Sequence, residues 1–453
     1  MPIRASFHLQ RFVELSMAAV SGQLHRYRAF PRVMTFADKT REEIETYQLE
    51  RLRDLLVHAG RTVPYYRHLF QEFGFRPEKI ADVRELEALP VTNKDTFREQ
   101  GDRMISTDYE KSRLLLRSTG GSTGEPFKFY ATPKEYEEQL AINLRSFALL
   151  GVYPGDRTAK IWGYDASQLA GNLISPLTGK LYFDTYRASP EEMTRWYHAM
   201  RLIRPKMIYA YASFVHHFAR HLASLGGSID GLQMVCSTAE KLFPEQREQI
   251  EQALGVRVFD MYGCHEVARL ASECLAGRMH TAPDAAVLEF LPDRDAGAEG
   301  GSRMLVTSLL SYAMPFIRYD VGDYAHPLQG TCSCGLEFPL LSLDMGRVHH
   351  IYTLPGGRRI QTGVIHKPLY KVEHLRAFRI CHRAIDRIEI LAVPEPSYEQ
   401  QVREGIDAVI EYLASKLGEE TRVDVSLVAE LPRVGRGKQP VVVSDVPEDT
   451  RFN

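Results

Sequence analysis

The 453-residue sequence has almost no net charge, few cysteines and no long apolar run. Its 56 basic and 58 acidic residues leave a formal charge of -2, so no overall field draws the chain to nucleic acid or to an anionic membrane. Six cysteines in so long a chain are too few for a disulfide framework. No stretch approaches the ~18 apolar residues of a membrane-spanning helix, and the interrupted apolar letters at the start do not make a signal peptide. We therefore expect a soluble, cytoplasmic, enzyme-sized protein with no nucleic-acid partner and no membrane span.

The composition that remains is that of an ordinary globular protein, with 44% hydrophobic and 25% charged residues. No repeat or low-complexity tract is present, and the length suggests about three structural units at roughly 150 residues each. Helical patterns occupy about residues 1–105. A further helix is predicted after Thr132, because Pro133 and Glu135 complete the signature of a capped helix N-terminus.

Short apolar runs alternate with helical segments between about residues 150 and 320. This rhythm of strand, helix and strand predicts parallel βαβ units. The segments concerned are strands at 207–211 and 232–236, a helix from Pro244 that closes at Gly255, and a strand at 256–262.

The pattern changes after Gly346. Strands are predicted at 376–381, 385–393 and 422–428, with a helix at 399–417. The sequence thus predicts an α/β fold in which a large N-terminal body, residues 1–345, carries the parallel βαβ units. A hinge at 346–350 leads to a small, mobile C-terminal α/β domain, residues 351–453.

Five short segments carry residue types suited to nucleotide chemistry. Residues 118–126, Ser-Thr-Gly-Gly-Ser-Thr-Gly-Glu-Pro, form a loop whose backbone N–H groups and hydroxyls suit a polyphosphate. The loop lacks the lysine of a Walker A motif, and a plain surface loop is an equally good interpretation. Residues 261–266, Met-Tyr-Gly-Cys-His-Glu, end a predicted strand, where Glu266 suits Mg²⁺ although most such glutamates are merely solvated.

The other three segments lie further along the chain. Residues 318–323, Arg-Tyr-Asp-Val-Gly-Asp, suit a ribose diol, but an ordinary β-turn with a local ion pair has the same letters. Residues 346–350, Gly-Arg-Val-His-His, sit where a hinge is expected. Residues 435–438, Gly-Arg-Gly-Lys, hold a lysine that is otherwise typical of a solvated loop. Each segment is weak evidence alone, whereas their order and spacing are specific.

Together these segments resemble the adenylate-forming superfamily, and more closely its phenylacetate–coenzyme A ligase and capsular-polysaccharide-protein branch. STGGSTGEP matches the phosphate loop, and Ser-Thr-Ala-Glu at 237–240 matches the adenine-site loop. YGCHE, RYDVGD, GRVHH and GRGKQP match the later motifs in order. The segments VPYYRHLF and LPVTNKDTFR also look like this branch, so the resemblance covers most of the chain.

The resemblance implies a role for each matched residue. The β- and γ-phosphates of ATP would be bound by Ser122, Thr123 and Gly124, and the adenine by Ser237, Ala239, Glu240, Tyr262 and Gly263. Glu266 would bind Mg²⁺, Asp323 with Arg318 would bind the ribose, and His265 would contact the substrate carboxylate unless it only fills the strand end. Arg347 and His349 would form the hinge, and Lys438 would bridge the carboxylate and the α-phosphate. The chain departs from the family at Glu125, where many relatives carry lysine, and at His349, where the hinge usually carries aspartate or lysine.

Four sulfur and imidazole ligands form a separate group. Cys332 and Cys334, with Cys274 and His280, suit a closed structural Zn²⁺ site, and some members of the branch carry such a zinc. The alternative is buried free cysteines beside a surface histidine. The remaining cysteines are expected to be unreactive: Cys236 and Cys381 in core strands, and Cys264 near the proposed site but without a general base.

The implied function is ATP-dependent activation of a carboxylic acid to an acyl-adenylate, followed by transfer of the acyl group to a thiol, most simply coenzyme A. A ligase that transfers to an amine or hydroxyl is the alternative enzyme. A noncatalytic nucleotide-binding relative is the alternative from another class, and the intact Glu266, Asp323 and Lys438 argue against it. Residues 162–172 and 209–217 are expected to line the acid pocket without fixing the acid, and a homodimer is left open.

Overall fold

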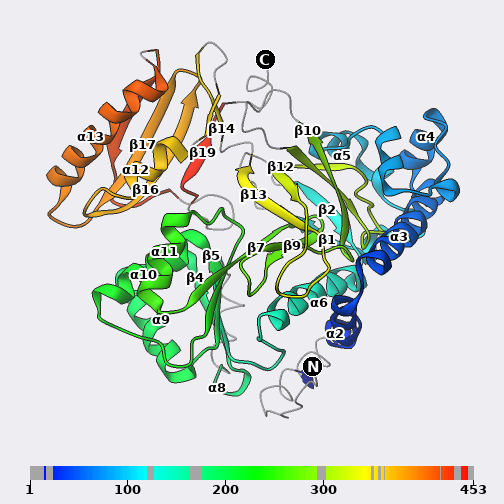
Figure 1. Cartoon of the computed structure of the whole chain (residues 1–453), viewed down its shortest axis with the longest axis horizontal. Coiled ribbons are helices and arrows are strands. Elements are labelled where there is room, and N and C mark those ends of the chain that lie inside the picture. Colours follow the sequence, from blue (N-terminus) through cyan, green and yellow to red (C-terminus); the bar gives the residue numbers. More distant parts are fainter. Residues whose placement is uncertain are drawn as a thin grey trace.

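The computed structural model describes residues 15–16, 24–119, 127–163, 175–292, 302–347, 351–355, 359–361, 363–418, 420–432 and 440–446 (Figure 1). The N-terminal part is helical, as predicted. Thr40 and Glu43 form a capping box at the start of the longest of these helices, and Pro64 begins the next one. The helices are α2 (His25–Thr35), α3 (Arg41–Thr62), α4 (Pro64–Glu72) and α5 (Lys94–Gln100).

The body is built on one large sheet, whose strand order in the described residues is β10-β11-β12-β13-β9-β8-β7-β6-β5-β3-β4. A separate hairpin of β1 (Leu115–Ser118) and β2 (Lys128–Ala131) flanks the phosphate-loop segment. The strands of the large sheet are β3 (Thr158–Trp162), β4 (Lys180–Asp184), β5 (Met207–Tyr211), β6 (Met234–Thr238), β7 (Arg257–Cys264), β8 (Ala268–Glu273), β9 (Met279–Thr281), β10 (Ala286–Pro292), β11 (Ser302–Ser308), β12 (Tyr319–Leu328) and β13 (Leu340–Arg347).

One half of this sheet confirms the predicted βαβ units. Strands β4, β3, β5, β6 and β7 pair in parallel. The connecting helices are α9 (Pro190–Ile203), α10 (Ala212–Ser224) and α11 (Pro244–Leu254), and side chains of α9, α10 and α11 share a core with β3, β4 and β5. The opposite face carries α6 (Pro133–Leu149), which begins with the predicted capping box of Thr132 and Glu135.

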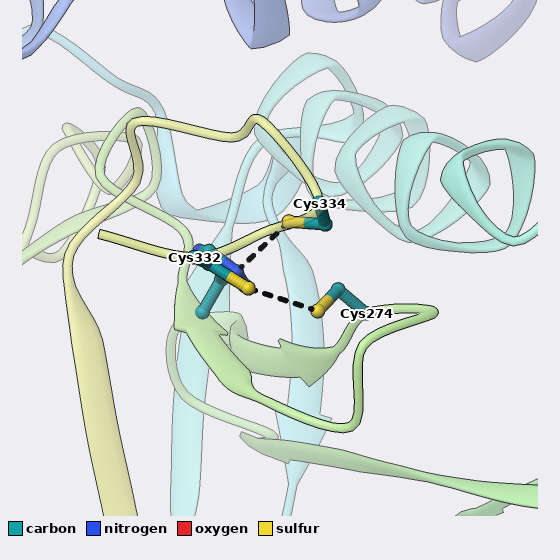
Figure 2. Close-up of side chains that lie close together, drawn as sticks. Cys274, Cys332 and Cys334 are labelled. Atoms are coloured by element: carbon teal, nitrogen blue, oxygen red, sulfur yellow. Dashed lines mark hydrogen bonds between the residues drawn. The ribbon is translucent and has the colours of Figure 1, made fainter.

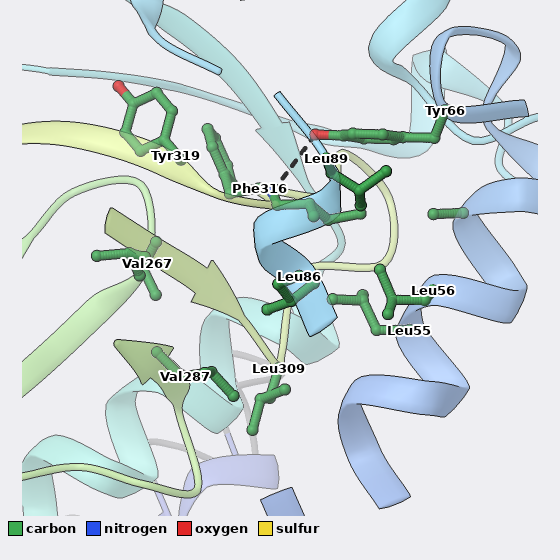
Figure 3. Close-up of a cluster of buried hydrophobic side chains, with 14 of the residues drawn as sticks. Leu55, Leu56, Tyr66, Leu86, Leu89, Val267, Val287, Leu309, Phe316 and Tyr319 are labelled. Atoms are coloured by element: carbon green, nitrogen blue, oxygen red, sulfur yellow. Dashed lines mark hydrogen bonds between the residues drawn. The ribbon is translucent and has the colours of Figure 1, made fainter. Parts of the chain in front are cut away.

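The other half of the sheet is antiparallel, which the sequence did not predict. From β7 through β8, β9, β13, β12 and β11 to β10 each neighbouring pair runs in opposite directions. The N-terminal helices pack onto this half (Figure 3). Leu55 and Leu56 of α3 share a core with Val287 and Leu309, and the buried Tyr66 hydroxyl donates to the Pro315 carbonyl at 3.0 Å. The antiparallel half is therefore the platform on which the helical N-terminus rests.

The C-terminal part has its own sheet and its own core (Figure 1). Its strand order is β18-β17-β16-β19, and the helix is found where it was predicted. A short pair, β14 (Ile351–Thr353) and β15 (Arg359–Gln361), precedes it. The elements of this part are α12 (Gly363–Leu369), β16 (Leu375–Ala384), β17 (Arg387–Pro394), α13 (Glu399–Leu417), β18 (Arg422–Leu427) and β19 (Val442–Ser444). The body also contains a single-turn helix, α8 (Ser175–Thr178).

None of the helices in the described part of the chain combines the length and the apolar character needed to span a membrane.

Candidate functional site

Two side-chain hydrogen bonds tie β12 to β7 and to the turn that follows β7, and each involves a carboxylate of the predicted site. The Tyr262 hydroxyl donates to Oδ2 of Asp323 at 2.6 Å, and the Tyr319 hydroxyl donates to Oε1 of Glu266 at 3.0 Å. Glu266 and Asp323 are 5% and 7% exposed, so both lie in a largely desolvated place. Because β7 and β12 are separated by three strands in the sheet order, this meeting could not be read from local sequence.

The thiol of Cys264 is close enough to both carboxylates for their charge to act on it. Burial, and then the negative charge of Glu266 and Asp323, raise the pKa of Cys264 well above its ordinary value. A thiol that stays protonated does not attack substrate. That Cys264 forms no covalent intermediate stays a prediction, and the raised pKa of its thiol supports it.

Gly263 is required by a close approach of two backbones. A Cβ atom at this position would lie 2.3 Å from the carbonyl oxygen of Ala268 on β8. Glycine therefore lets β7 and β8 pair tightly just where Tyr262 and Glu266 are presented.

The predicted adenine-site segment is tied to two elements. The Thr238 hydroxyl donates to the Met261 carbonyl at 2.8 Å, and Oε2 of Glu240 accepts from the Ser213 backbone N–H at 2.9 Å. Ala239 between them has φ +65°, in the left-handed region that costs a non-glycine residue roughly 1–2 kcal/mol. Backbone strain of this kind is concentrated at functional sites.

The structure places Arg318 differently from the ribose network that the resemblance implied. Its guanidinium Nε donates to Oε1 of Glu289 at 2.9 Å, and Nη1 donates to the carbonyls of Glu87 and Leu89. No bond among the described contacts joins it to Asp323. Arg318 instead anchors the loop before α5 to β10, with its own backbone at φ +48°.

For the other predicted residues the structure gives a position in the chain or a backbone pairing, or they lie outside the described residues. His265 directly follows β7, at the half-buried end of the strand. The backbone of Arg347 pairs with Asp323 across β12 and β13, so the hinge segment leaves the body next to the predicted ribose carboxylate. The residues that lie outside the described part of the chain are Ser122, Thr123, Gly124, His349 and Lys438.

An aromatic and cationic group adjoins the site on the face covered by α6, and only its aromatic members were expected. The Trp162 ring stacks on Tyr209 with centroids 5.7 Å apart. Arg269 of β8 donates from Nη2 to the Tyr209 hydroxyl at 3.2 Å and from Nε to Oδ1 of Asn143 at 3.1 Å. Burial lowers the pKa of Lys160, whose ammonium lies 4.8 Å from the Trp162 ring centroid. Part of the expected pocket segment, 164–172, lies outside the described residues.

The four proposed zinc ligands lie together, and Figure 2 shows the three cysteines among them. Their ligand atoms all lie within 4.8 Å of one another, with Sγ of Cys274 3.7 Å from Sγ of Cys332 and Sγ of Cys334 3.3 Å from Nε2 of His280. A tetrahedral zinc with bonds of about 2.3 Å to sulfur separates two sulfurs by about 3.8 Å. The other imidazole nitrogen, Nδ1, lies 3.0 Å from the Phe338 carbonyl. That contact fixes the tautomer that leaves Nε2 for a metal.

Comparison with known proteins shows which class of proteins shares this fold. No protein-family model matches the chain. A crystal structure of 2-hydroxyisobutyryl-CoA ligase in the postadenylation state superposes with a TM-score of 0.71 at 19% identity, covering 91% of each chain. The fold is therefore that of the acyl-adenylate-forming CoA ligases.

Sequence relatives point to a particular branch of that class. The chain is 25% identical over 399 residues to a phenylacetate-coenzyme A ligase of Thermus thermophilus, covering 82% of this chain and 86% of that protein. It is 22% identical over 283 residues to Protein CapK of Staphylococcus aureus, covering 61% of each. These relatives and the fold confirm the resemblance to the adenylate-forming superfamily.

Proposed function

We propose that this protein activates a carboxylic acid with ATP and transfers the acyl group to coenzyme A. The observation that carries the proposal is the pair of hydrogen bonds from β12 to β7 and to the turn after it, which holds Glu266 and Asp323 near the carboxyl end of β7. Ligands of α/β sheets bind at such strand ends. The similarity to phenylacetate-coenzyme A ligases supports the reaction class, and ATP and coenzyme A are cytoplasmic pools, which supports a cytoplasmic location.

In the first step a carboxylate oxygen attacks the α-phosphorus of ATP and pyrophosphate leaves, which yields an acyl-adenylate. We assign Asp323, held by Tyr262, to the ribose hydroxyls and the 237–240 loop to the adenine. We assign Ser122, Thr123 and Gly124 to the β- and γ-phosphates, and Lys438 to the charge that builds up between carboxylate and α-phosphate. In the second step a thiol adds to the acyl carbonyl and AMP leaves.

Glu266 is suited to act as a magnesium ligand. Tyr319 engages Oε1, and the described contacts leave Oε2 for a cation in a buried place. Mg²⁺ takes one or two carboxylates from the protein and completes its shell with phosphate oxygens and water. When bound it neutralises charge on the phosphates, while the protein positions the reactants.

The acid pocket is assigned to the group around Tyr209. Trp162 and Tyr211 supply apolar faces, with their ring centroids 4.1 Å apart, and Arg269 supplies N–H donors beside Tyr209. Such a lining suits an aryl acid or an acid with a hydroxyl group. The four convergent sulfur and imidazole ligands are assigned to one structural zinc.

Acid-dependent exchange of labelled pyrophosphate into ATP tests the first step. A panel of aryl, hydroxy and aliphatic acids is expected to give exchange with at least one aryl or hydroxy acid, and coenzyme A is then expected to drive AMP release. Glu266→Gln should abolish the exchange, since a neutral amide holds Mg²⁺ poorly. Absence of exchange with every acid would favour the noncatalytic alternative, and AMP release driven by an amine but not by a thiol would favour the amide-forming one.

A further inference from the structure

One arginine of the body makes three polar contacts with the small domain. Arg220 on α10 donates from Nη1 to the backbone carbonyls of Leu375 and Arg376, at 3.0 and 2.8 Å, and its Nη2 lies 3.2 Å from Oε1 of Glu395. Leu375 pairs with Pro394, so these acceptors form the open end of the β16–β17 hairpin. This hairpin is the centre of the small sheet, so a contact that fixes the hairpin against the body fixes the whole domain.

The acceptor side of this contact is already ordered within the small domain. Nδ1 of His374 lies 3.0 Å from Oε2 of Glu395, and the Glu395 backbone N–H donates to the His374 carbonyl at 2.8 Å. The His374 ring stacks on Tyr398 with centroids 3.6 Å apart. Because the carboxylate is held in place before docking, little side-chain entropy is lost when Arg220 binds it.

The rest of the contact between the two domains combines an aromatic cluster with open space. The Phe243 ring of the body lies 4.0 Å from the His366 ring of α12, centroid to centroid. A cleft of about 700 Å³ lies between α10, α11 and the segment 369–378. Two buried hydroxyl groups that line it, Oγ of Ser213 and Oη of Tyr370, have no hydrogen-bond partner among the described residues. The open space and the two unpaired hydroxyl groups reduce what burial contributes here, so the contacts of Arg220 act together with the aromatic cluster to hold the domain.

In the docked arrangement, β16 of the small domain lies near the adenine-site loop of the body. Nε of Arg379 on β16 donates to the Pro440 carbonyl at 3.0 Å, and the same guanidinium interacts electrostatically with Glu240 of the adenine-site loop. This interaction joins β16 of the small domain to the loop assigned to the adenine, so the arrangement seen here suits the step that consumes ATP.

We propose that Arg220 is a positioning residue that holds the small domain in the arrangement required for adenylation. This rests on the proposed function for the chemistry, but the domain contact itself does not. The hydrogen bonds described for the Arg220 guanidinium go to the small domain and to none of the residues assigned to nucleotide or acid. Its effect is therefore exerted through the population of docked molecules.

The experiment compares Arg220→Met and Arg220→Lys with a matched control, Arg195→Met, on the full-length protein. Arg195 lies exposed on α9, where its described partner is Glu192 on the same helix. Three quantities are measured: pyrophosphate exchange, coenzyme A-dependent turnover of a supplied acyl-adenylate, and the radius of gyration by X-ray scattering.

We expect Arg220→Met to slow adenylation about tenfold or more, with the KM for ATP within twofold, because the body alone holds the nucleotide. Turnover of the supplied acyl-adenylate should be unchanged or faster, and the radius of gyration should rise. Arg220→Lys should retain part of the rate, and Arg195→Met should match the wild type in all three measurements.

Equal slowing of both half-reactions together with a lower Tm would show that Arg220 only stabilises the body, and would overturn the proposal. Unchanged rates and dimensions would overturn it too, as would a loss confined to the second half-reaction. If the wild type catalyses no exchange with any acid, the proposed function fails, and the scattering of Arg220→Met still decides whether this arginine docks the small domain.

Discussion

At the scale of single residues, the site is set by groups whose partners come from distant parts of the chain. Asp323 meets Tyr262, which is 61 residues earlier, and Glu266 meets Tyr319, which is 53 residues later. Each tyrosine holds a carboxylate in a desolvated place, where a fixed acceptor binds a ligand hydroxyl more strongly than in water.

Asp323→Ala should weaken ATP strongly. A carboxylate that accepts from two ribose hydroxyls makes charge-assisted bonds of roughly 1.5–3 kcal/mol each, and about 1.4 kcal/mol corresponds to a tenfold change. We therefore expect the KM for ATP to rise at least tenfold in pyrophosphate exchange. Tyr262→Phe removes only the bond that orients the carboxylate, so its rise should be smaller. An unchanged KM in Asp323→Ala would move the ribose site elsewhere.

Glu266, Asp323, Tyr262 and the four cysteine and histidine ligands could be named from sequence because each belongs to a short motif or a distinctive residue type. The residues that each of these side chains contacts could not be named from sequence. Arg318 stands in the same motif as Asp323, yet its guanidinium binds Glu289 and two carbonyls more than two hundred residues earlier. Likewise Arg269 carries no local signal, and only the β7–β8 pairing brings it to Tyr209.

At the scale of elements, local signals predicted the helices better than the sheet. The capping residues at Thr132 and the apolar period of 399–417 gave α6 and α13 their positions. The strand predicted at 232–236 is found at Met234–Thr238, because an apolar run does not mark its own ends. The antiparallel half was missed for a related reason: strand direction depends on pairing between distant segments, which a single apolar run does not encode.

The zinc site is a property of a turn and a loop brought together. Cys274 and His280 flank the β8–β9 turn, and Cys332 and Cys334 lie in the loop after β12. Elemental analysis should find about one zinc per chain. Cys334→Ser should lower both zinc content and Tm, because metal binding there contributes folding free energy. The control variant Cys381→Ala removes a buried cysteine of β16, and this variant should still contain about one zinc per chain. Stable, active protein without metal would contradict the assignment.

His216 on α10 should make stability depend on pH. Burial lowers its pKa to about 4, the bond to Gln249 opposes this shift, and the positive charge of Arg220 adds to it. The unfolded histidine takes up its proton near pH 6.5, whereas the folded one resists until about 4. Folding stability from this group is therefore complete above pH 6.5 and is lost as the pH falls toward 4.

Between pH 7 and 5 the expected loss from His216 is about 2 kcal/mol, from 1.5 units at about 1.4 kcal/mol each. Urea unfolding of the wild type and of His216→Asn at the two pH values measures it. The variant should lose less stability on acidification than the wild type. An identical loss in both proteins would show that His216 titrates normally in the folded state.

At the scale of the whole molecule, the body holds the groups assigned to the nucleotide and the small domain brings one more. The predicted boundary at 346–350 stays a prediction, although the small sheet has a core of its own and β13 ends at Arg347. This division gives Lys438 a role that can be separated from nucleotide binding.

Lys438→Ala should slow adenylation about a hundredfold or more, by analogy with the loss of one charge-stabilising donor, and change the KM for ATP little. Turnover of a supplied acyl-adenylate should continue, since the bond to the α-phosphate is already formed. Rapid-quench measurement of each half-reaction checks this. Equal loss in both would mean that the lysine is structural.

The central claim is that a carboxylate oxygen attacks the α-phosphorus of ATP, and oxygen tracing tests it most directly. The acid found by pyrophosphate exchange is labelled with ¹⁸O in both carboxylate oxygens and turned over with ATP and coenzyme A. The account predicts one ¹⁸O atom in AMP and none in pyrophosphate, because the bridging oxygen leaves with AMP when the thiol takes the acyl group. Label in inorganic phosphate with ADP as the product, or unlabelled AMP, would contradict it.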